Sequence, residues 1–156
     1  MLVVEVPGRG PLEIEHLVLD VNGTIALDGS LIEGVAEALA QLTPQMKVVA
    51  VTADMHGTAS ALAVSPGIDV HVIDAGDEAR SKTVYVEELG PERVAAIGNG
   101  SNDEGMLGAA ALGICVIGRE GAATEAHAEA DIIVTSILDA LGLLVEPQRL
   151  IATLRR

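Results

Sequence analysis

The chain has 156 residues, a formal net charge of −14 and 49% hydrophobic residues, but only 1% aromatic residues and neither Phe nor Trp. This length fits one domain, residues 1–156, whose core is packed from Val, Leu, Ile and Ala, a composition that favours helices laid closely on a sheet. Nucleic acid and anionic lipid surfaces attract clustered Lys and Arg, so the negative charge argues against both as partners.

Three further features predict a cytoplasmic protein without a membrane segment. The single cysteine, Cys115, has no partner for an internal disulfide, as expected in a reducing compartment. The longest stretch without charged residues, between Glu104 and Arg119, is too short for the ~20 apolar residues of a spanning helix. The first ten residues, MLVVEVPGRG, lack the basic start and the continuous apolar run of a secretory signal.

The predicted elements begin with a hairpin over residues 1–15, where LVVEV and PLEIEHL alternate apolar and acidic positions around the turn PGRG. From residue 16 to 145, short β-branched runs alternate with segments of helical periodicity, and a last short helix is predicted over 146–156. The alternation predicts an α/β fold, a doubly wound, mainly parallel sheet with helices on both faces and the hairpin as a small antiparallel cover. The predicted strands are HLVLD, KVVAVT, DVHVID, RVAAIG, LGICVIG and DIIVT, and the predicted helices cover 32–42, 56–63, 77–89, 101–111, 121–128 and 136–144.

Four positions fall at or just beyond the ends of predicted strands, namely Asp20, Thr52, Lys82 and the loop GNGSND at 98–103. The carboxyl ends of parallel strands share one edge of a sheet, so these residues are expected to meet in one crevice. They comprise an acidic nucleophile, a hydroxyl, an ammonium and a polar loop suited to a cation. Phosphoryl transfer through an aspartyl phosphate requires this set of groups.

In this order the four segments resemble the motifs of the haloacid dehalogenase superfamily, which includes phosphatases and P-type ATPases. DVNGT resembles the first motif, VVAVTAD the second, Lys82 the third and IGNGSNDEGML the fourth, which is closest to its P-type ATPase form. The resemblance extends over nearly the whole chain from His16. It implies a phosphohydrolase that uses Mg²⁺ and forms an aspartyl phosphate.

The resemblance also implies a role for individual residues. Asp20 and Asn22 take the two catalytic positions, with Asp20 as the nucleophile. The implied phosphate-binding residues are Thr52, Ala53, Lys82 and Asn102, and the implied magnesium ligands are Asp20, Asn22 through its backbone carbonyl, Asn99 and Asp103.

Two positions depart from the pattern of the superfamily, because Asn22 and Asn99 stand where its phosphatases have aspartates. An amide oxygen can ligate magnesium, but an amide does not exchange a proton at neutral pH. General acid–base help contributes roughly 10²–10⁴ in rate, so a slow enzyme is expected unless the leaving group is good. Weaker magnesium binding is also expected, because the site has fewer carboxylates.

The spacings from Asp20 to Thr52 and from Thr52 to Lys82 each fit one βαβ unit and leave no room for the inserted cap that covers the site in members of the superfamily. The expected substrates are therefore a phosphorylated small molecule or a phosphoprotein. We also expect a homo-oligomer, with the hairpin at its interface and another subunit over the crevice. Light scattering tests this expectation, which a purely monomeric protein would contradict.

Several alternatives stay open at this level. The same residues fit a non-catalytic module that binds magnesium and phosphate, because both proton-handling positions are amides. A receiver-type signalling domain also uses Asp, Thr and Lys at strand ends, but its phosphorylated Asp comes later in the chain and its Lys closes the series. Taken singly, Asp20 or Thr52 would suit a turn or a helix cap. Arg80 is a rival cation to Lys82, and Asp54 and His56 are better explained by capping or exposure than by the site.

Overall fold

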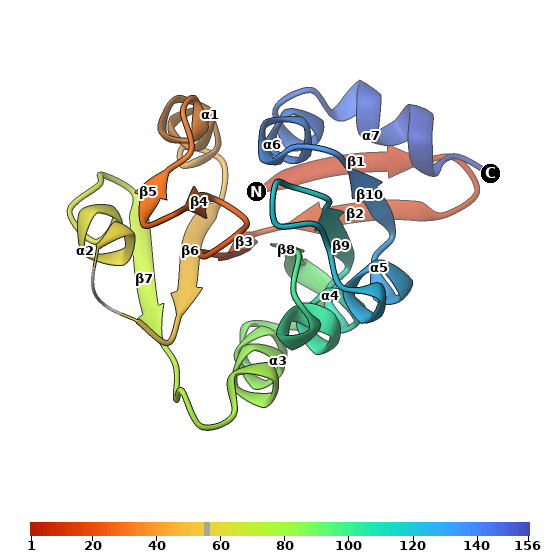
Figure 1. The fold of residues 1–156 in the computed structure, drawn as a ribbon. Helices are drawn as coiled ribbons and strands as arrows, with labels where there is room; N and C mark the ends of the chain where they lie inside the picture. The colour runs from red at the N-terminus through yellow and green to blue at the C-terminus, as the bar shows by residue number, and fades with distance from the viewer. Residues whose placement is uncertain (55–56) are drawn as a thin grey trace.

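The computed structural model describes residues 1–54 and 57–156 (Figure 1). A central sheet of six parallel strands has the order β10-β9-β8-β3-β6-β7. Its strands are β3 (His16–Asp20), β6 (Lys47–Thr52), β7 (Ile68–Val72), β8 (Val94–Gly98), β9 (Leu112–Val116) and β10 (Ile132–Val134). The chain adds β6 and β7 on one side of β3 and then crosses back to add β8, β9 and β10 on the other. The topological switch point therefore lies at β3, where open α/β sheets bind their ligands.

The central strands are continuous apolar runs because both faces of the sheet are covered. In β3, Leu17 and Leu19 pack into one core cluster and Val18 packs into the other. The strand pairs in parallel with β6 and β8, so that Leu17 lies opposite both Val48 and Ala95. Strands buried on both faces lose the alternation of polar and apolar residues, as these sequences do.

Helices lie on both faces of the sheet (Figure 1). One face carries α1 (Val35–Leu42) and α6 (Ile137–Val145), with α7 (Pro147–Leu154) beside α6. The other face carries α3 (Glu78–Leu89), α4 (Glu104–Ala109) and α5 (Thr124–Glu129), while α2 (Thr58–Leu62) lies beside the edge strand β7. Side chains start two of these helices, because Asp77 accepts a hydrogen bond from the Arg80 N–H of α3 and Ser136 accepts one from the Asp139 N–H of α6.

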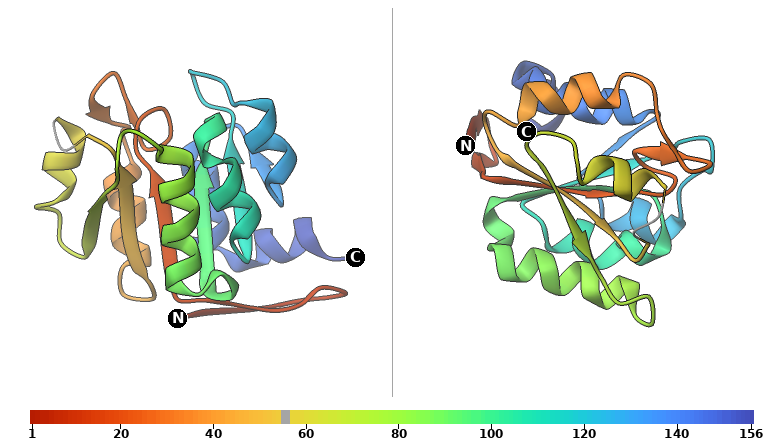
Figure 2. Two further views of the ribbon diagram at one scale, coloured as in Figure 1. Left: turned by 90° about the horizontal axis from the view of Figure 1, so that it is seen from below. Right: turned by 90° about the vertical axis from the view of Figure 1, so that its left-hand side faces the viewer.

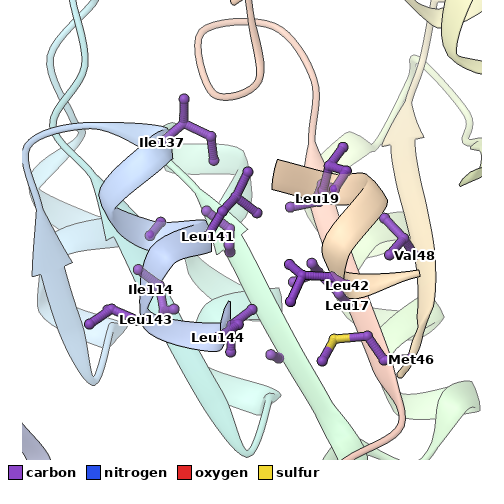
Figure 3. Packing of buried hydrophobic residues seen from close by; sticks show 14 of the residues in the cluster. Leu17, Leu19, Leu42, Met46, Val48, Ile114, Ile137, Leu141, Leu143 and Leu144 are labelled. Carbon is purple, nitrogen blue, oxygen red and sulfur yellow. The ribbon is translucent and has the colours of Figure 1, made fainter. Parts of the chain in front are cut away.

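Aliphatic side chains fill the core between the sheet and the first helical face. Figure 3 shows Leu141 and Leu144 of α6 and Leu42 of α1 pointing toward Leu17 and Leu19 of β3. All five of these side chains are completely buried. Burial of a leucine contributes about 1.5–3 kcal/mol, so the core holds β3 firmly beneath the residue that ends it, Asp20.

The N-terminal hairpin consists of β1 (Leu2–Val6) and β2 (Gly10–Ile14), which pair only with each other. Alternate side chains are buried, as the alternating sequence predicts. The hairpin crosses the end of the sheet at which the parallel strands begin (Figure 2, left). Backbone hydrogen bonds of 2.9 Å, from Glu15 N–H to Arg93 O and from Lys47 N–H to Glu15 O, join it to that end. It is therefore remote from the carboxyl ends of the strands.

The predicted fold class is confirmed, including the hairpin and the lack of an inserted cap domain among the described residues. Differences concern short elements. The helix predicted over 101–111 is a 3₁₀ turn, η2 (Ser101–Asp103), followed by α4, and a further 3₁₀ turn, η1 (Pro91–Arg93), precedes β8. The helix predicted from residue 32 begins at Val35, because Gly34 adopts a left-handed conformation with φ 87°.

A second small hairpin follows Asp20 and was not predicted. It pairs β4 (Ala26–Leu27) with β5 (Ser30–Leu31) through a turn in which Asp28 and Gly29 both have positive φ. Strands of two residues have no detectable sequence period, which explains why the pattern did not reveal them. In the described part of the chain, no helix is both long and apolar enough to cross a membrane.

Candidate active site

The loop that follows β3 folds back onto Asp20. The carbonyl of Val21 accepts hydrogen bonds from the N–H groups of Thr24, Ile25 and Ala26 at 3.2, 3.1 and 3.0 Å. This tight loop brings Thr24 Oγ1 within 2.8 Å of Asp20 Oδ2, and Gly23 permits it by adopting φ 83°. Asp20 is 7% exposed and Thr24 is 1% exposed, so the carboxylate is held in place at the switch point of the sheet.

Lys82 lies between two carboxylates. Its Nζ donates to Asp20 Oδ1 at 2.6 Å and to Asp103 Oδ1 at 2.7 Å, and its side chain is 2% exposed. The lysine comes from the buried face of α3, which it shares with Val86. Its sequence rival, Arg80, lines a separate groove between α3 and α4. The structure thus brings Lys82, and not Arg80, to the predicted nucleophile.

Asp103 is completely buried, and its oxygens are engaged within the protein. Its Oδ1 accepts from Lys82, and its Oδ2 accepts hydrogen bonds from the backbone N–H groups of Asn99 and Gly100, both at 2.9 Å. A Cβ on Gly98 would lie 2.5 Å from Asp103 Cγ, so only glycine at the end of β8 allows this approach. Asp103 therefore fixes both the loop 98–103 and the ammonium of Lys82.

Two buried carboxylates around one ammonium perturb the ionisation of the cluster. The pKa of Asp20 is raised to about 6, chiefly by burial and also by the nearby charge of Asp103, against the opposing effects of Lys82 and Thr24. Burial by itself lowers the pKa of Lys82, but the attraction of Asp20 and Asp103 outweighs it, so the net shift is upward. Both directions are compatible, because the lysine faces two opposite charges whereas Asp20 also faces a like charge.

A cavity of about 250 Å³ opens over this cluster at the carboxyl ends of β3, β6 and β8. Of the predicted site residues, all but Asp103 line it, and Asp103 lies buried behind Lys82. Its walls are formed by Asp20, Asn22, Thr52, Ala53, Asp54, Glu78, Lys82, Asn99, Gly100, Asn102 and Glu120. The segments that follow β3, β6, β8 and β9 thus meet in one place, as the predicted parallel topology requires.

Polar contacts position the remaining predicted residues. The hydroxyl of Thr52 accepts a hydrogen bond from the Asp54 N–H at 3.1 Å and also lies 3.2 Å from the Asp54 carbonyl. Asn102 donates through Nδ2 to Glu78 Oε2 at 2.8 Å. Asn99 accepts from Thr24 at 3.1 Å and donates to Gly121 O at 3.3 Å. Their predicted roles in binding phosphate or metal remain predictions.

Four wall or contact residues were missed by sequence reasoning. Thr24 lies inside the quoted DVNGT segment, so its hydroxyl, four residues from Asp20, was a signal that could have been used. Glu78 and Glu120 lie in no motif, and Asp54 was assigned to capping or exposure, whereas it lines the cavity. His56 lies outside the described residues.

The donor set of the cavity suits a hard cation that is held weakly. Asp20 is the only one of the predicted magnesium ligands that offers a carboxylate to the cavity, beside the amides Asn22 and Asn99. Within residues 1–54 and 57–156, no three His, Cys, Asp or Glu side chains are grouped so that they could hold a metal ion by themselves. Oxygen ligands fit Mg²⁺, which also keeps waters and substrate oxygens in its coordination shell. The residues therefore fit Mg²⁺ bound together with a phosphate group.

Sequence comparisons relate the chain to an uncharacterized protein and to a subunit of a transport ATPase. The uncharacterized protein MJ0073 of Methanocaldococcus jannaschii is 49% identical over 84 residues, which span 51% of this chain and 90% of that protein. The ATP-binding subunit of the potassium-transporting ATPase of Xanthomonas campestris pv. campestris is 33% identical over 107 residues, or 68% of this chain. The match spans only 16% of that subunit.

Solved structures share the fold at low sequence identity. The 3-deoxy-D-manno-octulosonate 8-phosphate phosphatase of Moraxella catarrhalis, in complex with magnesium, phosphate and the sugar acid, has a TM-score of 0.67 and 20% identity, covering 92% of this chain and 95% of that chain. The catalytic domain of the CPx-ATPase CopB has a TM-score of 0.60 and 21% identity, covering 75% and 47%. The model of the haloacid dehalogenase-like hydrolase family matches residues 3–111, well over half of the sequence. The chain therefore belongs to the haloacid dehalogenase-like hydrolase family.

Proposed function

We propose that the protein is a magnesium-dependent phosphohydrolase that acts through a phosphorylated Asp20. The observation that carries this proposal is the position of the Asp20 carboxylate, which is oriented by Lys82 and Thr24 at the floor of a cavity at the switch point of the sheet. Membership of a hydrolase family and the fold shared with a phosphatase that binds magnesium and phosphate support it.

The chain's own residues divide the chemistry as follows. Asp20 is ionised at neutral pH, because its pKa of about 6 lies below 7. One carboxylate oxygen forms a bond to phosphorus while the bond between phosphorus and the leaving group breaks. The ammonium of Lys82 and the hydroxyl of Thr52 are donors for the phosphoryl oxygens. A bound Mg²⁺ would be held by Asp20, Asn22 and Asn99, and would supply the positive charge that lets a carboxylate approach a phosphate.

The amide at position 22 determines which substrates can react. Asn22 lines the cavity but cannot protonate a departing alkoxide, because an amide has no exchangeable acidic proton near neutral pH. Substrates whose leaving groups are already stable as anions avoid this requirement. We therefore propose acyl phosphates, phosphoanhydrides and aryl phosphates as the favoured class, over phosphate esters of simple alcohols.

Trapping of the phosphoenzyme tests the proposed function directly. The protein is mixed with radiolabelled acetyl phosphate and Mg²⁺ and quenched with acid, and the labelled residue is identified by mass spectrometry. We expect one labelled site, Asp20, that is sensitive to hydroxylamine, as an acyl phosphate is. Label should be absent from Asp20→Asn and after removal of magnesium with EDTA. An unlabelled protein would contradict the proposal.

Restoring a carboxylate at position 22 should accelerate the reaction with poor leaving groups. For Asn22→Asp we expect roughly 10²-fold faster hydrolysis of an alkyl phosphate, because general acid help contributes on this scale. Acetyl phosphate, which needs no acid, should change much less. The matched variant Asn22→Ala removes the amide without adding an acid and should not accelerate either substrate. Equal rates for Asn22→Asp and the unaltered protein would show that proton donation at this position is not limiting.

The amides at positions 22 and 99 also favour a second candidate function, a non-catalytic module that binds magnesium and phosphate. Its signature is different. Such a module would bind Mg²⁺ and inorganic phosphate, which calorimetry detects, while no label is transferred to Asp20 from acetyl phosphate. If the protein binds Mg²⁺ and phosphate but takes up no label, the non-catalytic module is the correct function and the phosphohydrolase proposal is wrong.

A further inference from the structure

A tight turn lies against the loop of the nucleophile. The turn runs from Gly118 to Gly121 and is closed by a 3.0 Å hydrogen bond from the Gly121 N–H to the Gly118 carbonyl. Glu120, at one corner of this turn, lines the cavity, and its Oε2 occupies the space that a Cβ on Gly23 would need. Glu120 therefore extends over the residue that directly follows Asn22.

Asn99 links this turn by hydrogen bonds to the loop that follows Asp20. Its Nδ2 donates to the Gly121 carbonyl at 3.3 Å, and its own carbonyl accepts from the Ala123 N–H at 2.8 Å. On the other side, its Oδ1 lies 3.1 Å from Thr24 Oγ1. Asn99 is 8% exposed. An aspartate here would have no N–H for the Gly121 carbonyl. Asn99, which itself carries no carboxylate, thus helps to position the turn that carries the Glu120 carboxylate.

Two of the other carboxylates around Asp20, those of Glu78 and Asp103, accept hydrogen bonds from other groups of the site. Glu78 accepts from Asn102 on the α3 side of the cavity. Asp103 is completely buried and accepts from Lys82 and two backbone N–H groups. Glu120 is exposed to solvent at the cavity wall, and its carboxylate lies beside Gly23, the residue that follows Asn22.

We propose that Glu120 accepts the proton of the water that hydrolyses phosphorylated Asp20, the task that Asn22 cannot perform. The inference rests on the proposed function and names a residue for its second step. As the oxygen of water bonds to phosphorus, its proton passes to a Glu120 carboxylate oxygen. The bond between phosphorus and the Asp20 oxygen breaks, and its electron pair returns to the Asp20 carboxylate. Inorganic phosphate leaves, and Glu120 releases its proton to solvent.

Decay of the isolated phosphoenzyme tests this step apart from the first one. The protein is phosphorylated with acetyl phosphate and Mg²⁺, excess donor is removed rapidly, and the label on Asp20 is followed after acid quenching. For Glu120→Gln we expect the decay rate to fall about 10²-fold, while the rate of phosphorylation stays within about twofold. Labelled enzyme should therefore accumulate at steady state.

Three further variants separate proton transfer from a loss of structure. Arg119→Gln alters the neighbouring exposed position of the same turn and should decay at the unaltered rate. Glu120→Asp retains a carboxylate on a shorter side chain and should recover part of the lost rate. Asn99→Asp at saturating Mg²⁺ should slow the decay but add little to Glu120→Gln, because both changes act through one carboxylate.

The possible results distinguish failure of the inference from failure of the proposed function. Equal decay rates for Glu120→Gln and the unaltered protein, with both labelled on Asp20, would overturn the role of Glu120 and leave the phosphohydrolase intact. If Arg119→Gln slowed the decay as much as Glu120→Gln does, the effect would come from a change in the turn, and the proposed role of Glu120 would be overturned as well. An unaltered protein that takes up no label would overturn both.

Discussion

Replacing Lys82 by methionine is expected to destabilise the protein by about 3–5 kcal/mol, because the change leaves two buried carboxylates without their counter-charge. Lys82 Nζ lies 2.6 Å from Asp20 Oδ1 and 2.7 Å from Asp103 Oδ1, and methionine preserves much of the side-chain volume while removing the ammonium. Urea unfolding of the metal-free protein near pH 7.5 measures the loss. Phosphorylation of Asp20 should fall as well, since Lys82 is one of the proposed phosphate ligands.

The pH dependence of this loss identifies its cause. Without the ammonium, nothing offsets the repulsion of the Asp20 carboxylate by Asp103, so Asp20 takes up a proton more readily in the folded protein than in the unfolded chain. The deficit in the free energy of unfolding should therefore shrink as the pH falls toward about 4.5. Lys47→Met, at the exposed start of β6, is the control and should change stability by less than about 0.5 kcal/mol. A deficit for Lys82→Met that does not depend on pH would point to packing instead of charge.

Replacing Asp20 by asparagine is expected to abolish the phosphoenzyme and yet to stabilise the metal-free protein. The folded-state pKa of Asp20 is raised from 3.8 to about 6, so the folded protein binds this proton more tightly than the unfolded chain does. Ionisation of Asp20 then costs stability progressively as the pH rises from about 4 to about 6, and the full cost is present above that range. The shift corresponds to on the order of 3 kcal/mol.

Paired unfolding measurements test this prediction. Near pH 7.5 Asp20→Asn should exceed the unaltered protein in the free energy of unfolding, and the difference should shrink toward about pH 4 as Asp20 takes up its proton. Saturating Mg²⁺ should reduce the difference at high pH, because the cation binds the carboxylate of the unaltered protein. A less stable Asp20→Asn near pH 7.5 would mean that attraction to Lys82 exceeds the costs of burial and of repulsion by Asp103.

A more stable Asp20→Asn protein would show that the carboxylate proposed for the reaction destabilises the folded, metal-free protein. The cluster of Asp20, Lys82 and Asp103 holds one more negative than positive charge when it is fully ionised, in a place where their side chains are 10% exposed or less. Burial of an unbalanced charge is unfavourable, but it leaves Asp20 in need of a cation. This arrangement is compatible with the proposed binding of Mg²⁺ together with phosphate.

The sequence by itself determined the sheet, its parallel topology and the convergence of Asp20, Thr52, Lys82 and the 98–103 loop. The predicted strands HLVLD and KVVAVT match β3 and β6 residue for residue. They can be recognised because strands that are buried on both faces have nearly continuous apolar sequences. Once strands alternate with helices, the rule that parallel strands end at one edge places the residues that follow them. Local pattern and topology are sufficient for these features.

Only the tertiary structure decided how the side chains within the site are paired. Lys82 joins Asp20 and Asp103 across 62 and 21 residues of sequence, and Thr24 meets Asn99 across 75. The Glu120 turn reaches Gly23 in the same way, and no motif contains it. Such contacts depend on how α3 reaches the end of β3 and how the 118–121 turn reaches the loop that follows it, and these placements have no period or spacing in the sequence. The residue types in the sequence show which functional groups are available, whereas tertiary packing determines which charged groups contact each other.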